Sequence, residues 1–287
     1  MLLSMNFANL FIILTLVFSA LSHAQERINT AKMDDVQKYV NKLVSDVGAE
    51  NILVVYDFDN TLMAMDLDLG SDQWYQWQSE AIKSGKKKEQ MAKNTGELFN
   101  LAYKLFALGD MHAVESDTPR IVSEIQKSKI KSIILTSRGS EYRQDVLAEL
   151  ERAGMNFADS AIGPKEGYAG LFVPEGFERP RLISFSEGIV MGSGQNKGEI
   201  LKFILKKTGL KFKKIVFVDD TLKNIENVEK SFADEKNMIA FFYTHEADRV
   251  KKFEGNKTRV WREWKHIRPA LDFISSEQKS RAAEFSK

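Results

Sequence analysis

The sequence contains no cysteine. This absence excludes disulfides, zinc sites built on thiolates and cysteine nucleophiles. The 287 residues also lack an excess of either charge, because 41 lysines and arginines face 40 aspartates and glutamates. A net charge of +1 gives no electrostatic reason to expect nucleic acid or an anionic membrane surface as a partner. With 43% hydrophobic and 28% charged residues, the composition is that of a globular protein.

Only the N-terminus carries a long hydrophobic run. Residues 1–24 contain no charged side chain, and small residues at Ser22 and Ala24 precede a polar segment. This pattern predicts a secretory signal peptide cleaved after Ala24. We therefore expect an exported protein, periplasmic or secreted, with no stable membrane span after cleavage. The alternative is a retained N-terminal membrane anchor, because the run approaches the roughly 20 residues that a spanning helix needs.

In the rest of the chain, short β-branched apolar runs alternate with helical patterns. Apolar residues spaced three and four apart predict the helices, and the short runs are typical of buried strands. The predicted strands are 51–56, 130–135, 215–218 and 238–243, and the predicted helices are 33–47, 141–153 and 197–207. This alternation indicates an α/β fold with a Rossmann-like, doubly wound, mostly parallel sheet.

Residues 66–117 depart from this alternation. The segment is long and helix-like, and it interrupts the path from the first predicted strand to the second. We therefore predict a small helical cap inserted after the first core strand, with the core formed by residues 25–65 and 118–287. Within the core, a β-hairpin is expected to turn near Glu187 and Gly188. The C-terminal segment around Trp261 and Trp264 is expected to be a helix docked on the sheet.

Polar residues follow three of the predicted strands. Asp57 and Asp59 follow the first, residues 136–138 follow the second, and Asp219 and Asp220 end the third. Ligands of open α/β sheets bind beyond the carboxyl ends of the strands, so we expect these residues to share one crevice. Neighbouring carboxylates repel each other, and a divalent cation offsets that cost. Hard oxygen ligands suit Mg²⁺, which we predict as the cofactor.

These residue types support phosphoryl transfer through an aspartyl-phosphate. Asp57, at the strand tip, is the expected nucleophile, and Asp59 is the expected acid and base. The Asp59 backbone carbonyl is also expected to reach the metal. Thr61 is expected to cap the turn and to hydrogen-bond the phosphoryl oxygens or the carboxylates. Asp219, with Asp220 as a further candidate, is expected to complete the metal site from another strand.

Further groups are expected to bind the phosphate. Either Thr136 or Ser137 offers a hydroxyl at a strand end, and Arg138 follows them as a binding or surface residue. Lys197, at a predicted helix start, places a positive charge against the charge that accumulates in the transition state. Asn224 is expected either to orient the metal site or to face solvent.

The segments DFDNT at 57–61, LTSR at 135–138, Lys197 and VDD with Asn224 at 218–224 resemble the four motifs of the haloacid dehalogenase superfamily of phosphohydrolases. The similarity covers residues 54–243, with the motifs in the same order. It implies the same roles for Asp57, Asp59, Lys197 and Asp219, and it implies a cap where this chain has residues 66–117. The layout also looks like that of exported bacterial members with no assigned substrate.

We therefore expect a Mg²⁺-dependent hydrolase of a small-molecule or protein phosphomonoester. The alternatives are an exported binding or effector protein that keeps the fold without turnover, and a phosphotransferase. Trp74, Tyr75 and Trp77 lie shortly after the acidic loop. Aromatic residues at this spacing are mostly core, and one of the three facing the crevice would stack on an aromatic leaving group.

Overall fold

The computed structural model describes residues 26–164, 167–168, 173–174 and 176–285. The predicted signal peptide, residues 1–24, lies outside the described residues. Within the described ranges, no helix is both long enough and apolar enough to cross a membrane.

A seven-stranded sheet forms the centre of the molecule. Its order is β1-β9-β8-β2-β5-β7-β6, and every neighbouring pair is parallel except β6 with β7. In that order the strands are β1 (Glu26–Thr30), β9 (Met238–Tyr243), β8 (Lys214–Asp219), β2 (Ile52–Tyr56), β5 (Lys131–Thr136), β7 (Ile189–Met191) and β6 (Ser184–Ser186). The four predicted strands and the α/β class are confirmed. Strand β1 was not predicted, because its sequence is polar and three of its five residues are exposed.

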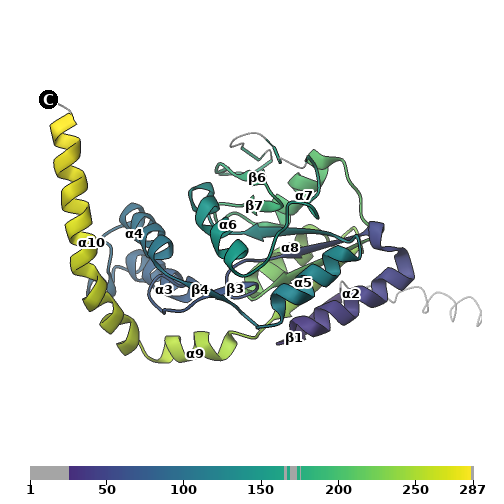
Figure 1. The fold of residues 1–287 in the computed structure, drawn as a ribbon, viewed down its shortest axis with the longest axis horizontal. Coiled ribbons are helices and arrows are strands. Elements are labelled where there is room, and N and C mark those ends of the chain that lie inside the picture. The colour runs from purple at the N-terminus through teal and green to yellow at the C-terminus, as the bar shows by residue number, and fades with distance from the viewer. Residues whose placement is uncertain (1–25, 165–166, 169–172, 175, 286–287) are drawn as a thin grey trace, which may run out of the picture.

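Helices cover both faces of the sheet (Figure 1). One face packs against α2 (Met33–Val47), α5 (Thr118–Lys127) and α6 (Arg143–Arg152), and the other against α7 (Lys197–Thr208) and α8 (Leu222–Ser231). Successive side chains of a strand point to opposite faces. In β2, accordingly, Val54 joins the first core cluster and Val55 joins the second. Two buried layers therefore hold the carboxyl ends of the central strands in place.

The hairpin predicted near Glu187 and Gly188 is present as β6 and β7. Both turn residues have positive φ, 52° and 76°, as a tight two-residue hairpin turn requires. A Cβ on Gly188 would lie 2.4 Å from the backbone oxygen of Phe157, so only glycine fits there. The hairpin extends the sheet beyond β5, since β7 pairs with β5.

Most of the segment between β2 and β5 is helical. Near its two ends, the segment forms a two-stranded antiparallel sheet of β3 (Met63–Met65) and β4 (Met111–Ala113). Between these strands lie α3 (Asp72–Lys83), the short 3₁₀ helix η3 (Lys87–Glu89) and α4 (Thr95–Leu108). The helical character predicted for this segment is therefore present.

The predicted C-terminal helix is present, but it packs on a different part of the molecule from the one predicted. The chain continues from the sheet into α9 (Ala247–Gly255) and α10 (Thr258–Phe285). Val260 and Leu271 are buried with Trp74 and Leu98 of the inserted helices, and Trp77 packs edge-on against Trp261. The prediction that this helix docks on the sheet is wrong: it packs on α3 and α4 (Figure 1). The aromatic spacing identified an apolar helix face but carried no information about its partner.

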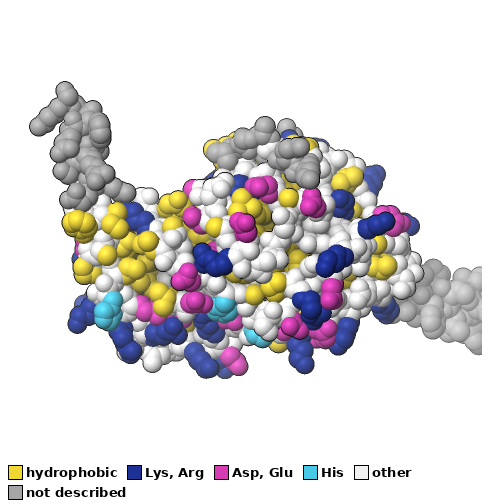
Figure 2. All heavy atoms as spheres, viewed as in Figure 1, with side chains coloured by type: hydrophobic (Ala, Val, Ile, Leu, Met, Phe, Trp, Pro, Cys, Tyr) yellow, Lys and Arg dark blue, Asp and Glu magenta, His cyan; other side chains and the backbone are white. Residues whose placement is uncertain are grey.

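The surface carries both charges. On the face seen in Figure 2, basic and acidic side chains are interspersed, and apolar side chains gather at the end of the molecule where α4 and α10 lie. Phe99 of α4 and Phe273 of α10 are among the exposed hydrophobic residues, with 47% and 65% of their surface accessible. The interspersed charge agrees with the balanced composition.

Candidate active site

Two neighbouring parallel strands bring buried aspartates together at their carboxyl ends. Asp57 directly follows β2, and Asp219 is the last residue of β8. The Asp57 amide donates to the carbonyl of Val218 at 2.8 Å, which fixes the two strand ends side by side. Asp57 and Asp219 are 6% and 0% exposed. One ligand oxygen each of Asp57, Asp219 and Asp220 lies within 4.8 Å of the others. The convergence expected from the sequence is therefore present for these three carboxylates.

Lys197 lies between the two buried aspartates. Its Nζ is 2.6 Å from Asp57 Oδ1 and 2.7 Å from Asp219 Oδ2, and the residue is 1% exposed. Asn196 caps α7 by accepting hydrogen bonds from the backbone amides of Gly198 and Glu199, which makes Lys197 the first helical residue. Gly198 has no room for a Cβ, which would lie 2.7 Å from the carbonyl of Asn227 in α8. Tight packing of α7 on α8 thus places the lysine.

The charges of this centre are strongly coupled. Burial raises the pKa of Asp57 well above its ordinary value, and the carboxylates of Asp219 and Asp59 add to this effect against the opposing Lys197. Burial, followed by Asp219 and Asp57, likewise raises the pKa of Asp220. Burial alone would lower the pKa of Lys197, but Asp219 and Asp57 outweigh it and raise that pKa. Within the described residues, Lys197 is the lysine that contacts Asp57 and Asp219, so a bound cation would relieve the remaining repulsion among the carboxylates.

The carboxylates also offer ligand atoms for a divalent metal ion. Asp219 is held by Asn224, whose Nδ2 lies 3.0 and 3.2 Å from its two oxygens, and by the amide of Thr221. The position of Asn224 agrees with the expectation that it orients this site. Thr61, in the loop after Asp57, is fully buried, and its hydroxyl has no hydrogen-bond partner among the described residues. Hard oxygen donors and an unpartnered buried hydroxyl fit a magnesium ion and a phosphoryl group.

Asp59 lies outside this acidic group. Its two carboxylate oxygens accept hydrogen bonds from Nη2 and Nε of Arg138, at 2.7 and 2.9 Å. The guanidinium lies over the rings of Phe106 and Tyr142, 3.7 and 4.9 Å from their centroids. Sequence reasoning missed this arrangement, because Phe106 is contributed by α4, far away in the sequence. Arg138 was predicted as a substrate-binding or surface residue, and in this structure it is buried against Asp59.

The two candidate hydroxyls after β5 differ in their surroundings. Thr136 is fully buried, and its Oγ1 accepts a hydrogen bond from the amide of Arg138 at 3.1 Å. Ser137 is exposed, and its carbonyl accepts from the amide of Gly194. The choice between the two as the phosphate-binding hydroxyl stays a prediction.

The three aromatic residues of α3 have different roles. Trp74 is fully buried in the cluster shared with α10, and Tyr75 packs against Phe99. Trp77 lines a cavity between α3 and α9 that also includes Asp220. One aromatic residue of this helix thus faces a cavity that reaches the acidic centre.

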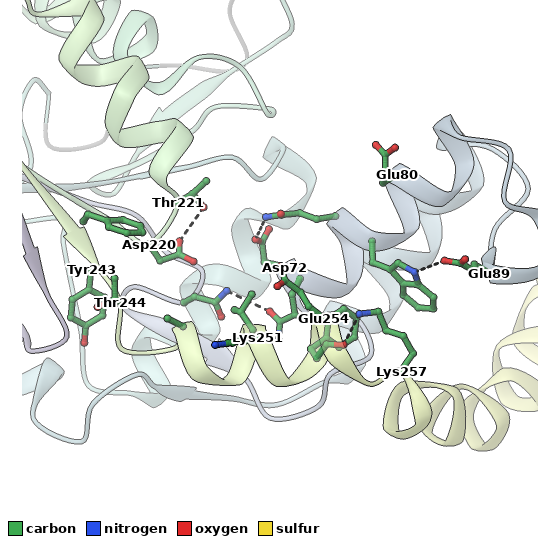
Figure 3. Close-up of a pocket in the computed structure, with 18 of the residues that line it drawn as sticks. Asp72, Glu80, Glu89, Asp220, Thr221, Tyr243, Thr244, Lys251, Glu254 and Lys257 are labelled. Atoms are coloured by element: carbon green, nitrogen blue, oxygen red, sulfur yellow. Dashed lines mark hydrogen bonds between the residues drawn. The ribbon is translucent and has the colours of Figure 1, made fainter.

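Asp72, at the start of α3, is a further acidic residue near the centre that the sequence did not single out. It lines the same cavity as Asp220 (Figure 3). Burial, reinforced by the Asp59 carboxylate, raises the pKa of Asp72 to about 6. Because a single aspartate in a helical segment is usually a surface residue, only the fold reveals this position.

We expect Asp72→Asn to stabilise the protein at alkaline pH. The folded pKa of Asp72 exceeds the unfolded value of about 3.9, so wild-type stability falls as the pH rises from about 4 to 6. The asparagine variant avoids this loss. We expect a gain of about 1–2 kcal/mol at about pH 8, reduced from the full shift because the carboxyl group is partly exposed. Urea unfolding at several pH values measures it. A gain that does not shrink towards about pH 4.5 would contradict this explanation.

A family model with the description "Protein of unknown function (DUF2608)" matches residues 29–278. The chain belongs to this family. The match includes the whole acidic centre, the inserted helices and most of α10. No curated relative matches the chain.

Two solved structures show limited similarity. The class C acid phosphatase from Bacillus anthracis is 12% identical, with a TM-score of 0.39 over 76% of this chain and 85% of that one. A cytosolic 5'-nucleotidase IIIB bound to cytidine is 14% identical, with a TM-score of 0.32 over 76% of this chain and 81% of that one. At this level of similarity, we draw no conclusion from them about the activity of this chain.

Proposed function

We propose that this protein is a Mg²⁺-dependent phosphomonoester hydrolase that acts through an aspartyl-phosphate on Asp57. The observation that carries the proposal is the meeting of Asp57, Asp219 and Asp220 at the carboxyl ends of β2 and β8, with Lys197 between the first two. The resemblance of the surrounding motifs to those of the haloacid dehalogenase superfamily agrees with it. The segment 66–117 is proposed to act as the cap.

Asp57, Asp219 and Asp220 would hold the metal, with the Asp59 backbone carbonyl as a further ligand. When bound, the ion would neutralise the carboxylates and draw negative charge from the phosphoryl oxygens. The chain itself supplies two more groups. Lys197 is a fixed positive charge, and the Thr61 hydroxyl, which has no partner in the described part of the chain, would donate a hydrogen bond.

In the proposed reaction, a carboxylate oxygen of Asp57 attacks phosphorus and the bond to the leaving-group oxygen breaks. Asp59, which must first leave Arg138 and take a proton from solvent, gives that proton to the leaving-group oxygen. A water molecule then attacks phosphorus, Asp59 takes the proton of the water, and the Asp57–phosphorus bond breaks to release inorganic phosphate. Lys197 stays beside Asp57 throughout, so the positive charge is in place before the transition state forms.

The pairing of Asp59 with Arg138 adds one requirement to this scheme. Both Asp59 oxygens are engaged by the guanidinium, so one of them must leave Arg138 to reach the leaving group. Arg138 itself is held by the rings of Phe106 and Tyr142. We propose that Arg138 keeps Asp59 oriented between turnovers and that movement of the inserted helices is linked to its release.

Activity should depend on a divalent cation. We expect hydrolysis of a chromogenic aryl phosphate by protein starting at Gln25, abolished by a chelator and restored by Mg²⁺. Binding of the ion should also stabilise the fold, by about 2.7 kcal/mol at a concentration a hundredfold above the dissociation constant. A phosphate-release assay and thermal unfolding of the chelated protein, with and without Mg²⁺, measure the two effects.

The same assay separates the alternatives. Mg²⁺-dependent stabilisation without hydrolysis across a broad ester panel would favour a binding or effector protein without turnover. Phosphorylated products in the presence of added alcohols would indicate a phosphotransferase. Hydrolysis that continues unchanged in chelator would contradict the metal site. We also propose export of the protein, on the basis of the sequence of residues 1–24.

A further inference from the structure

A cavity of about 940 Å³ runs from the acidic centre between α3 and α9 (Figure 3). Figure 3 shows Asp220 and Thr221 at one side of the cavity and Glu89 and Lys257 at the other, and Trp77 and Phe253 also line it. The volume is in the range of small-molecule sites. Because Asp220, a proposed metal ligand, forms part of its wall, a phosphoryl group on Asp57 would place its leaving group in or beside this cavity.

The first residues of α3 contribute polar groups to the cavity near the acidic centre. Asp72 accepts a hydrogen bond from Gln76 at 2.5 Å, and its carboxylate is within electrostatic range of Asp59 and Arg138. Figure 3 shows Asp72 and Asp220 entering the cavity from facing elements. Asp72 is thus a carboxylate from the inserted helices that lies close to the proposed acid and base.

The neighbouring side chain, Gln73, has an unused hydrogen-bond donor. Gln73 lines the cavity and is 95% buried, since only 5% of its surface is accessible. Its Oε1 accepts a long hydrogen bond from Asn60 at 3.5 Å, whereas its Nε2 has no partner among the described residues. Burying an amide donor without an acceptor costs free energy of folding. We therefore infer that a ligand accepts the hydrogen bond of Gln73 Nε2.

The charge of the cavity favours a cation. Five of its lining side chains are carboxylates and two are lysines. The carboxylates are Asp72, Glu80, Glu89, Asp220 and Glu254, and the lysines are Lys251 and Lys257. Lys257 is already engaged, because its Nζ lies 3.8 Å from the ring centroid of Phe253 and donates to the carbonyl of that residue. The walls therefore repel an anionic leaving group and attract an ammonium group.

We infer that Asp72 and Gln73 form a leaving-group site that selects phosphomonoesters of amino alcohols. The Asp72 carboxylate accepts hydrogen bonds from an ammonium group a few atoms from the ester oxygen, and Gln73 Nε2 donates to an oxygen of the same leaving group. This inference rests on the proposed phosphatase activity and goes beyond it by naming the substrate class.

The test compares three esters of similar size whose leaving groups are cationic, neutral or anionic: phosphoethanolamine, ethyl phosphate and phosphoglycolate. At about pH 8 the carboxyl group of Asp72 is ionised, given its pKa of about 6. We expect kcat/KM for phosphoethanolamine to exceed that for ethyl phosphate by about tenfold, with phosphoglycolate the poorest substrate. Asp72→Asn should reduce the tenfold preference to about twofold or less, the contribution left by the remaining carboxylates.

The matched control is Asp248→Asn, which removes the same charge from an exposed position on α9 that does not line the cavity. It should leave the ratio unchanged. Hydrolysis of all three esters without a preference for phosphoethanolamine, or an equal ratio in Asp72→Asn and wild type, overturns the inference and leaves the proposed activity intact. Should the protein turn over no ester, the proposed activity fails. Calorimetric binding of the same esters in Mg²⁺ then decides the inference: tighter binding of phosphoethanolamine supports the cation site, and equal affinities overturn it.

Discussion

Asp57→Asn is expected to lower kcat by on the order of 10⁴-fold or more while leaving the fold intact. The amide has nearly the shape of the carboxylate but cannot act as the nucleophile that forms an aspartyl-phosphate. The substitution also removes one of three neighbouring carboxylates, which lowers the repulsion among them, so we expect the variant to stay folded. Phosphate release under saturating Mg²⁺ measures the loss, and circular dichroism with thermal unfolding verifies the fold.

Asp248→Asn serves as the control, because it removes one negative charge from the surface of α9 without touching the acidic centre. It should retain wild-type turnover. Substantial turnover by folded Asp57→Asn would eliminate Asp57 as the nucleophile.

Lys197→Met is expected to destabilise the protein by about 3–5 kcal/mol in the absence of a divalent cation. Methionine has a similar length but no charge, so Asp57 and Asp219 would remain buried without the ammonium group that lies 2.6 and 2.7 Å from them. For a domain of this size the loss corresponds to a fall in melting temperature of roughly 10 °C. Urea unfolding in chelator measures it.

The stability of Lys197→Met should depend on pH and on Mg²⁺ if the loss comes from unpaired buried charge. Protonation of the remaining carboxylates relieves their repulsion, so the difference from wild type should shrink from about pH 8 to about pH 5. Excess Mg²⁺ should recover part of the stability, but activity should stay low because the charge beside the phosphoryl group is still missing. Lys206→Met, an exposed position on the same helix, should change stability by less than about 0.5 kcal/mol. A large loss that neither acid nor Mg²⁺ reduces would indicate a packing defect instead.

The parts of the site that follow directly from strand ends are predictable from the sequence. A buried strand places the next residue at the carboxyl edge of a parallel sheet, so the strand pattern predicts that Asp57 and Asp219 lie at the same edge. That β2 and β8 are neighbours is seen only in the structure. The helix start at Lys197 is likewise visible, because Asn196 is a strong capping residue followed by an amphipathic pattern. Strand ends and helix caps are local features of the sequence, so they place these residues at a strand end or a helix start without knowledge of the fold.

The remaining features depend on contacts between distant segments. Asp59 meets Arg138 across 79 positions of sequence, and the ring that holds Arg138 comes from α4. The burial of Asp72 and the packing of α10 on the inserted helices depend in the same way on how the helices dock. An amphipathic pattern shows which face of a helix is buried but does not name its partner, which is why the prediction that α10 docks on the sheet is wrong.

The most direct test of the account is to trap the phosphorylated enzyme. The protein would be mixed with a ³²P-labelled phosphomonoester and Mg²⁺, quenched in acid during turnover, digested and mapped by mass spectrometry. We predict acid-stable label on Asp57 alone, absent in chelator and in Asp57→Asn, and more abundant in Asp59→Asn, where attack by water is slowed. Steady hydrolysis with no label on Asp57, or with label on another residue, would contradict the account.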